Sequence, residues 1–406
     1  MLWITYATFY LCRVNFSIAI PSIMDELGFS KTALGLVGSA LFAMYAIGQF
    51  VNGQLGDKFG GRKLIAIGIF VSLTLNVLFG FSSVFLLMMI LWGLNGFFQS
   101  MGWPSTVKMA ANWFYKSRGK VGGALGSSYQ IGNVFSWALA GFVIGILGWR
   151  WGFWIPAIVF LFSGIHWVMN GPKNAPEEEG LPSIEEEEGL GTKKSRTDHY
   201  LGFGFTSNKT LKNPHVWCVA IAFFFLDVVR YGFMLWVPTF LFEIQEATIS
   251  VAAYKALAMP LVGCLGAFFA GWASDRYFKS KRAPIAAIML YMLALFIWVY
   301  PQIPVGLWIP SLLCLMLIGV MTYGPHVVMV GIIPMTFGTR KASASVTGFI
   351  DGFGYIGAAF TGVGSAWLVD NFGWNAAFNF WLMGAFVSAL LMTLLWNYKP
   401  KKEMYL

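Results

Sequence analysis

Two arginines stand in otherwise apolar stretches and are the residues best suited to bind a ligand. Arg13 lies in FYLCRVNFSIAIP, and Arg230 lies in FFFLDVVRYGFMLW. A charged side chain at the centre of a bilayer costs about 3 kcal/mol on insertion scales, so it has to face protein or a water-filled cavity. A guanidinium keeps its charge and donates paired hydrogen bonds to phosphoryl or carboxylate groups. The two stretches therefore predict an anion-binding site inside a membrane.

The composition of the chain requires that membrane. Of the 406 residues, 57% are hydrophobic and only 11% are charged, whereas about a quarter of a soluble domain is charged. The apolar stretches are continuous and about twice the length of a barrel strand, which is roughly ten residues. The sequence therefore predicts an all-α, polytopic membrane protein.

Twelve apolar stretches are long enough to be spanning helices. The first begins at Met1 without a charged leader region or a cleavage site, so it is expected to be a retained helix rather than a signal peptide. The expected spans are 3–24, 33–55, 63–81, 84–111, 118–146, 151–170, 213–240, 249–273, 284–301, 306–336, 343–369 and 374–397.

One long polar segment divides the twelve spans into two sets of six. It is rich in charge, proline and glycine and has no hydrophobic period, which is typical of a linker. The expected organisation is a six-helix bundle over 1–170, a cytoplasmic linker over 171–212, and a second bundle over 213–406 with a short tail. The acidic run Glu185–Glu188 in the linker is expected to be solvated.

The two halves repeat each other in parallel. Arg13 and Arg230 are 217 residues apart (230 − 13), and Asp57 and Asp275 are 218 apart (275 − 57). Two such repeats are typical of a transporter whose bundles rock around a central substrate site. Pseudo-symmetry then predicts that the two arginines face each other across that site.

Lysine and arginine gather in every second short loop. Positive loops stay on the cytoplasmic side, so both termini and the linker are expected to be cytoplasmic. The net charge of +9 is thereby explained as a topology signal, and nucleic-acid binding is not needed to account for it.

The segment GQLGDKFGGRK resembles the loop-two signature of the major facilitator superfamily, G-x-L-x-D-x-x-G-R-K. The resemblance implies twelve helices in two pseudo-symmetric six-helix bundles. It also implies that this loop packs helix ends and controls opening on the cytoplasmic side. The residues assigned to this structural and gating role are Gly53, Asp57, Arg62 and Lys63, with Asp275 and Arg276 at the equivalent place in the second half.

Five further segments resemble the organophosphate:phosphate antiporters, which include the glycerol-3-phosphate and hexose-phosphate transporters. They are YATFYLCRVNFSIAIP, GWPSTVKMAANWF, VVRYGFMLWVPTFL, TYGP and GFIDGFGYIG. The resemblance implies that Arg13 and Arg230 bind the phosphoryl group. It also implies that Tyr6, Tyr10 and Tyr45 belong to the same site.

The chain departs from that family at three places. Gln49 stands where the glycerol-3-phosphate transporter has a lysine, and Tyr129, followed by Gln130, stands where it has a histidine. Asp227 replaces a tyrosine and lies three residues before Arg230, so the two can pair on one helix face. These residues and Tyr355 complete the expected substrate site, and Asp227, His326 and Asp351 are the candidates for proton coupling.

The favoured function is a secondary transporter of a small phosphorylated organic anion, exchanged for inorganic phosphate. The alternative is a proton-coupled symporter of sugar acids or other carboxylates, in the related anion:cation symporter branch. A signalling sensor on a transporter scaffold is a third class. An enzyme is not expected, because the sequence has no carboxylate pair, nucleophile–base constellation, metal cluster or phosphate-binding loop.

No cofactor or metal is expected. The expected partners are a small anionic substrate, inorganic phosphate as counter-substrate, and the lipid bilayer. The family resemblance implies a monomer, and the expected location is the plasma (inner) membrane.

Overall fold

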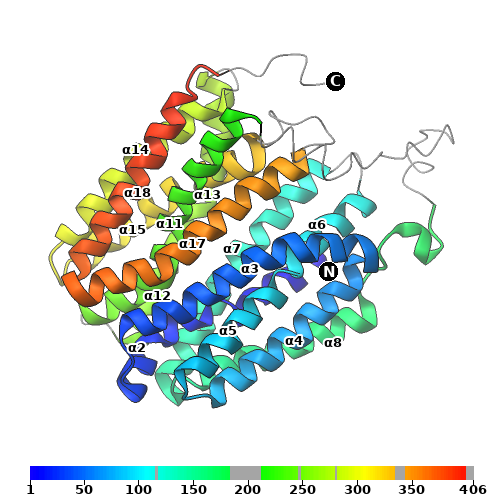
Figure 1. Ribbon diagram of the computed structural model, residues 1–406, viewed down its shortest axis with the longest axis horizontal. Helices are drawn as coiled ribbons and strands as arrows, with labels where there is room; N and C mark the ends of the chain where they lie inside the picture. Colours follow the sequence, from blue (N-terminus) through cyan, green and yellow to red (C-terminus); the bar gives the residue numbers. More distant parts are fainter. Residues whose placement is uncertain (115–117, 183–211, 246–247, 279–280, 334–342, 399–406) are drawn as a thin grey trace. The chain divides into compact units, whose positions relative to one another are not determined.

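The computed structural model describes residues 1–114, 118–182, 212–245, 248–278, 281–333 and 343–398 (Figure 1). In this part of the chain, every regular element is helical, and twelve helical stretches are long and apolar enough to cross a membrane. The predicted all-α fold with twelve spans is confirmed. The spans are Leu2–Leu27, Lys31–Gln49, Gly61–Phe81, Phe85–Ala110, Leu125–Leu147, Trp151–Asn170, Pro214–Glu243, Ile249–Phe278, Arg282–Gln302, Trp308–Val330, Gly348–Phe372 and Trp374–Leu394.

Local signals place the ends of several helices. α11 (Pro214–Glu243) starts after Asn213, whose side chain accepts a hydrogen bond of 3.0 Å from the backbone N–H of His215. Asparagine is a favoured N-cap and proline a favoured first helical residue. α2 (Asn15–Leu27) stops at Gly28, whose φ of 68° is readily adopted only by glycine.

The described residues group into two compact units. Unit 1 lies within Met1–Phe29, Leu36–Thr197 and Thr248–Tyr254, and unit 2 lies within Ser30–Gly35, Asp198–Ala247 and Lys255–Leu406. Two helices start in one unit and continue in the other. α3 (Lys31–Phe59) begins in unit 2, and α12 (Ile249–Ala256) begins in unit 1.

Each unit packs its own helices around small residues. In unit 1, α4 (Gly61–Phe81) lies against α5 (Phe85–Gln99) and α8 (Trp151–Asn170) (Figure 1). A Cβ on Gly96 of α5 would lie 2.1 Å from the carbonyl oxygen of Leu41 in α3. Only glycine allows this approach of two backbones, which is a common way for membrane helices to pack closely.

The helices of unit 2 pack in the same manner. Its principal pairs are α11 with α17 (Ser343–Phe372), α13 (Ala258–Phe278) with α15 (Trp308–Val327), and α14 (Arg282–Val299) with α18 (Trp374–Leu394). A Cβ on Gly266 of α13 would lie 2.1 Å from the carbonyl oxygen of Val320 in α15.

The first span is not the single helix that the sequence predicts over 3–24. α1 (Leu2–Phe9) is followed by one 3-10 turn, η1 (Tyr10–Cys12), and the chain re-enters a helix only at the start of α2. Arg13 lies in this break, with φ −125° and ψ −49°. The fourth span is also divided, into α5 and α6 (Gly102–Trp113), and α15 continues into a π-helical turn, η4 (Val328–Ile332).

Some expected features fall outside the described residues. These are most of the 171–212 linker, including Glu185–Glu188, together with the side chains of Asp57 and Asp275 and the surroundings of Gly53.

Candidate functional site

Arg13 is buried in unit 1, with 7% of its surface exposed. Its Nε and Nη2 atoms donate to one oxygen, Oε1 of Gln99, at 3.2 and 3.1 Å. The guanidinium carbon lies 4.6 Å from the ring centre of Tyr10 and 4.7 Å from that of Tyr45. Aromatic faces attract a cation electrostatically at this range, so amide and rings together hold the charge in place.

Side-chain amides bind the backbone at the break in the first span. The carbonyl oxygen of Cys12 accepts hydrogen bonds from Asn76 at 3.1 Å, Asn95 at 2.8 Å and Gln99 at 3.5 Å. Asn15 donates to the carbonyl oxygen of Gly152 at 3.0 Å. Backbone groups freed from a helix inside a membrane have to find partners in the protein, and α4 and α5 supply them here.

The aromatic residues predicted around Arg13 form one layer in unit 1. Tyr6 packs edge-on against Tyr10, with ring centres 6.0 Å apart, and lies 4.9 Å from Trp103. The rings of Tyr10 and Tyr129 are 6.3 Å apart. These rings come from α1, η1, α6 and α7 (Arg118–Leu147).

The two predicted glutamines lie beside members of this layer. Gln130 is buried and follows Tyr129 on α7. Gln49 is half-buried and lies one turn after Tyr45 on α3. Their positions keep them as candidates for the wall of the site.

Arg230 is buried in unit 2 with a different set of partners. Its Nη1 atom donates to Oδ1 of Asp227 at 3.4 Å and to Nε2 of His326 at 3.0 Å. Its guanidinium carbon lies 4.6 Å from the ring centre of Tyr231 and 5.5 Å from that of Tyr323. The structure thus brings together Asp227 and His326, which the sequence offered as separate candidates.

α17 brings the remaining predicted residues to this cluster. The rings of Tyr355 and Tyr231 are 5.7 Å apart. A Cβ on Gly354 would lie 2.4 Å from Oδ2 of Asp227, so the helix backbone approaches this carboxylate closely. Asp351, one turn earlier, is half-buried and interacts electrostatically with Asp227 and Arg230.

The two arginine clusters differ in charge. Gln99 is neutral, so its bonds orient Arg13 without offsetting its charge. Asp227 is a carboxylate, and it offsets charge on Arg230 when ionised.

The sequence interpretation missed Gln99 and Tyr323. The sequence does contain a signal for Gln99. Gln99 lies four residues after Asn95 within an apolar stretch, and Ser72 and Asn76 form a second polar pair with the same spacing.

The predicted gating loop is tied to the beginning of the polar segment. Oδ1 of Asn174 accepts a hydrogen bond from the backbone N–H of Arg62 at 3.0 Å. The Arg62 side chain donates to the carbonyl oxygen of Val168 at 2.9 Å, and Trp167 donates to the Arg62 carbonyl at 3.0 Å. The side chains of Lys63 and Arg276 are exposed.

The repeat also places two equivalent glutamates, Glu26 and Glu243, which are 217 residues apart (243 − 26). Each accepts a hydrogen bond from an indole N–H. Trp149 donates to Glu26 at 2.8 Å, and Trp374 donates to Glu243 at 3.0 Å. Glu26 also pairs with Arg150 in unit 1.

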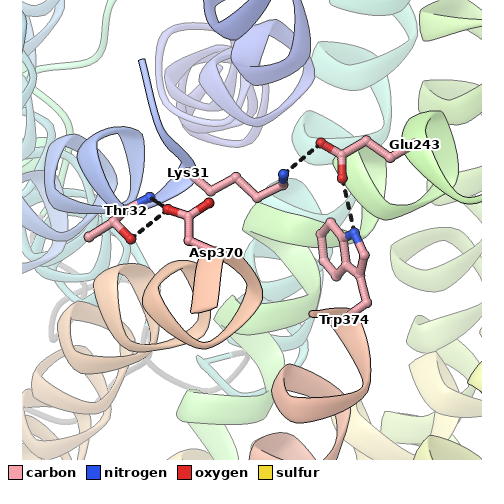
Figure 2. Close-up of polar contacts among 5 residues, drawn as sticks. All are labelled: Lys31, Thr32, Glu243, Asp370 and Trp374. Atoms are coloured by element: carbon pink, nitrogen blue, oxygen red, sulfur yellow. Dashed lines mark hydrogen bonds and ion pairs between the residues drawn. The ribbon is translucent and has the colours of Figure 1, made fainter. Parts of the chain in front are cut away.

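Asparagine follows Trp374 where arginine follows Trp149, and Glu243 pairs instead with the start of α3. Nζ of Lys31 lies 3.0 Å from Oε1 of Glu243, and Figure 2 shows this ion pair. Beside this pair, the backbone N–H and hydroxyl of Thr32 donate to Oδ2 of Asp370 at 2.7 and 2.6 Å. These contacts attach residues 30–35 to unit 2.

Among the residues that the structure describes, no three histidine, cysteine, aspartate or glutamate side chains are grouped so that they could hold a metal ion. The chemistry available in the two clusters is therefore that of guanidinium, carboxylate, imidazole, phenol and amide groups.

Comparison with known proteins shows which family the whole chain resembles. The sequence profile described as Major Facilitator Superfamily matches residues 2–361. The chain is 30% identical to a probable hexose phosphate transport protein of Chlamydia pneumoniae, covering 98% of this chain and 90% of that protein. It is 31% identical to the glycerol-3-phosphate transporter of Bacillus subtilis, covering 99% of this chain and 92% of that protein.

A third relative is described as a membrane sensor. The membrane sensor protein UhpC of Escherichia coli is 26% identical, over 99% of this chain and 92% of that protein. Among solved structures, a bacterial homologue of the human lysosomal transporter Spinster superposes with a TM-score of 0.78 at 14% identity. That match covers 97% of this chain and 93% of the other, and at such low identity it bears on the fold alone.

Proposed function

Since the chain belongs to the major facilitator superfamily, we propose that it is a secondary transporter of a small phosphorylated organic anion. The substrate is of the sugar phosphate or glycerol phosphate kind, and inorganic phosphate is the counter-substrate. The described roles of the relatives in Chlamydia pneumoniae and Bacillus subtilis support this class of substrate.

The observation that carries the proposal is the pair of buried arginines at equivalent places in the repeat. Arg13 and Arg230 are each fixed by hydrogen bonds and by two aromatic rings. A phosphoryl group matches the fork of a guanidinium and can accept from more than one such group. In the proposed mechanism both arginines bind the same phosphoryl group, and the tyrosines and glutamines around them select the organic part.

Transport then proceeds by alternating access of two bundles, 1–170 and 213–406, joined by the segment 171–212. We place both termini and that segment in the cytoplasm and the protein, as a monomer, in the inner membrane. The distribution of lysine and arginine between alternate loops supports this orientation. Exchange follows if the substrate-free site, with two arginines, resists the transition that a bound anion permits.

The test is phosphate exchange by the purified protein in liposomes. Vesicles loaded with phosphate should take up labelled phosphate from outside, and Arg13→Lys and Arg230→Lys should each abolish this uptake. Glycerol-3-phosphate and hexose 6-phosphates would then be ranked as competitors. If the unmodified protein is shown to be folded and correctly oriented in the vesicles and still does not exchange phosphate, the antiporter proposal is rejected.

A second candidate is a proton-coupled symporter of organic carboxylates. The cluster of Asp227, Arg230 and His326, with Asp351 nearby, favours it because it contains groups that exchange protons. Carboxylate uptake driven by an inward proton gradient, in vesicles without phosphate, would support this candidate. Binding of a sugar phosphate without any exchange would instead indicate a sensor.

A further inference from the structure

We infer that Gln99 is a positioning residue for the anion site, because it aims the guanidinium of Arg13 through a single amide oxygen. This inference rests on the proposed function in that the guanidinium is taken to bind the phosphoryl group. Gln99 belongs to α5 and has no exposed surface. It lies 86 residues after Arg13 in the sequence.

The contact has the geometry of an orienting interaction. One oxygen, Oε1 of Gln99, accepts from both Nε and Nη2 of Arg13, at 3.2 and 3.1 Å. Two donors on one edge of a planar group fix the plane of that group as well as its position. Rotation about the last bonds of the arginine side chain would break at least one of these hydrogen bonds.

The orientation of the amide is itself determined by its neighbours. Nε2 of Gln99 donates to Oγ of Ser72 at 2.7 Å and to the Cys12 carbonyl oxygen at 3.5 Å. Ser72 in turn donates to Oδ1 of Asn95 at 2.5 Å. This chain of donors and acceptors leaves the amide oxygen, and not the nitrogen, facing the arginine. A flipped amide would place N–H donors against a cation.

The same network couples the arginine to the break in the first span. Asn95 and Gln99 both donate to the carbonyl oxygen of Cys12, the residue before Arg13. Arg13 departs from helical backbone angles at this point. One amide therefore holds the backbone beside Arg13 and the tip of its side chain, which is the preorganisation that a tight site requires.

A neutral acceptor suits this task. A carboxylate at the same place would also hold the guanidinium but would offset its charge, as Asp227 does for Arg230. We therefore expect two separable effects at position 99. Loss of the acceptor loosens Arg13, and gain of a negative charge neutralises it.

The experiment compares Gln99→Met, Gln99→Glu and a matched control, Asn52→Leu. Asn52 is likewise a buried amide of unit 1, and it donates to the Phe97 carbonyl and to Ser100 rather than to the arginine. The dissociation constant of inorganic phosphate is measured by calorimetry on each full-length protein in detergent. Gln99→Met should weaken binding at least tenfold, Gln99→Glu should weaken it further, and Asn52→Leu should change it less than threefold.

A second readout needs no ligand. The Nε–H groups of the nine arginines are labelled with ¹⁵N, and the signal of Arg13 is identified by its loss in Arg13→Lys. We expect this signal to exchange slowly with water in the unmodified protein, Gln99→Glu and Asn52→Leu, and rapidly in Gln99→Met. A merely structural role for Gln99 would leave the Arg13 signal no more affected by Gln99→Met than by Asn52→Leu.

The outcomes separate the two proposals. If the unmodified protein binds phosphate and Gln99→Met binds it equally well, the positioning role is overturned and the transport proposal stands. If the unmodified protein does not bind phosphate while the Arg13 signal still depends on Gln99, the phosphate site is overturned and the orienting contact stands. An Arg13 signal that is unchanged in Gln99→Met overturns the inference.

Discussion

The carboxylate of Asp227 lies 3.4 Å from Nη1 of Arg230, one turn along the same helix, and both side chains are buried. This pair occupies unit 2, whereas the equivalent arginine in unit 1 is held by the neutral amide of Gln99. The two halves of the repeat have therefore kept the arginine and changed its partner. That difference in charge is the basis of the first prediction.

Asp227→Asn should make the protein depend on phosphate for its stability. Removing one member of a buried ion pair leaves the other charge uncompensated, which costs about 3–5 kcal/mol. A bound phosphate would restore the missing negative charge, so the rise in Tm on adding phosphate should be larger in the variant than in the unmodified protein. Thermal unfolding in detergent across a phosphate titration measures both. A variant with unchanged Tm and an unchanged response to phosphate would show that the pair contributes little.

Arg13→Lys and Arg230→Lys should each reduce phosphate exchange by at least a hundredfold. Lysine keeps the charge but loses the planar fork, so bidentate contact with a phosphoryl group is not possible. Initial rates of labelled phosphate entry into phosphate-loaded vesicles measure the effect. Lys212→Arg, at an exposed position, serves as the matched control and should retain full exchange. Retention of exchange by either arginine variant would remove that residue from the substrate site.

Gly354→Ala should destabilise the protein, and Gly364→Ala on the same helix should not. A Cβ at position 354 would lie 2.4 Å from both Asp227 and Phe223, while nothing lies within 4 Å of a Cβ at position 364. Overpacking of this kind costs about 1–3 kcal/mol. Tm values of the two variants, measured side by side, give the comparison. Equal Tm values would mean that α11 and α17 adjust without strain.

Glu243→Leu should lower the stability of the protein more than Lys31→Met. Glu243 accepts from Trp374 and pairs with Lys31, so leucine removes two interactions whereas the lysine variant removes one (Figure 2). Both groups are partly exposed, at 16% and 25%, so the ion pair alone is worth at most about 1 kcal/mol.

Glu243→Gln separates the two contacts of that glutamate, because its amide oxygen still accepts from the indole. It should behave like Lys31→Met. Thermal unfolding at low and high salt tests this, since screening weakens only the ion pair. If Glu243→Leu is no worse than Lys31→Met, the indole contact adds nothing to stability.

Several features of this protein could be predicted from the sequence alone. Twelve spans follow from the length and continuity of the apolar stretches, because a bilayer requires about twenty apolar residues per helix. The equivalence of Arg13 and Arg230 follows from their spacing in the repeat. The twelve spans are confirmed because they depend on local composition alone, and the equivalence of the two arginines stays a prediction.

The tertiary structure decided what surrounds those arginines. At the break beside Arg13, amides of α4 and α5 bind the carbonyl oxygen of Cys12, and the first span by itself does not identify these partners. His326 lies 96 residues after Arg230 and contacts it, and Lys31 pairs with Glu243, which lies 212 residues later in the sequence (243 − 31). A polar side chain in an apolar helix indicates that a polar partner is needed. The packing of helices that are distant in sequence determines which partner it contacts.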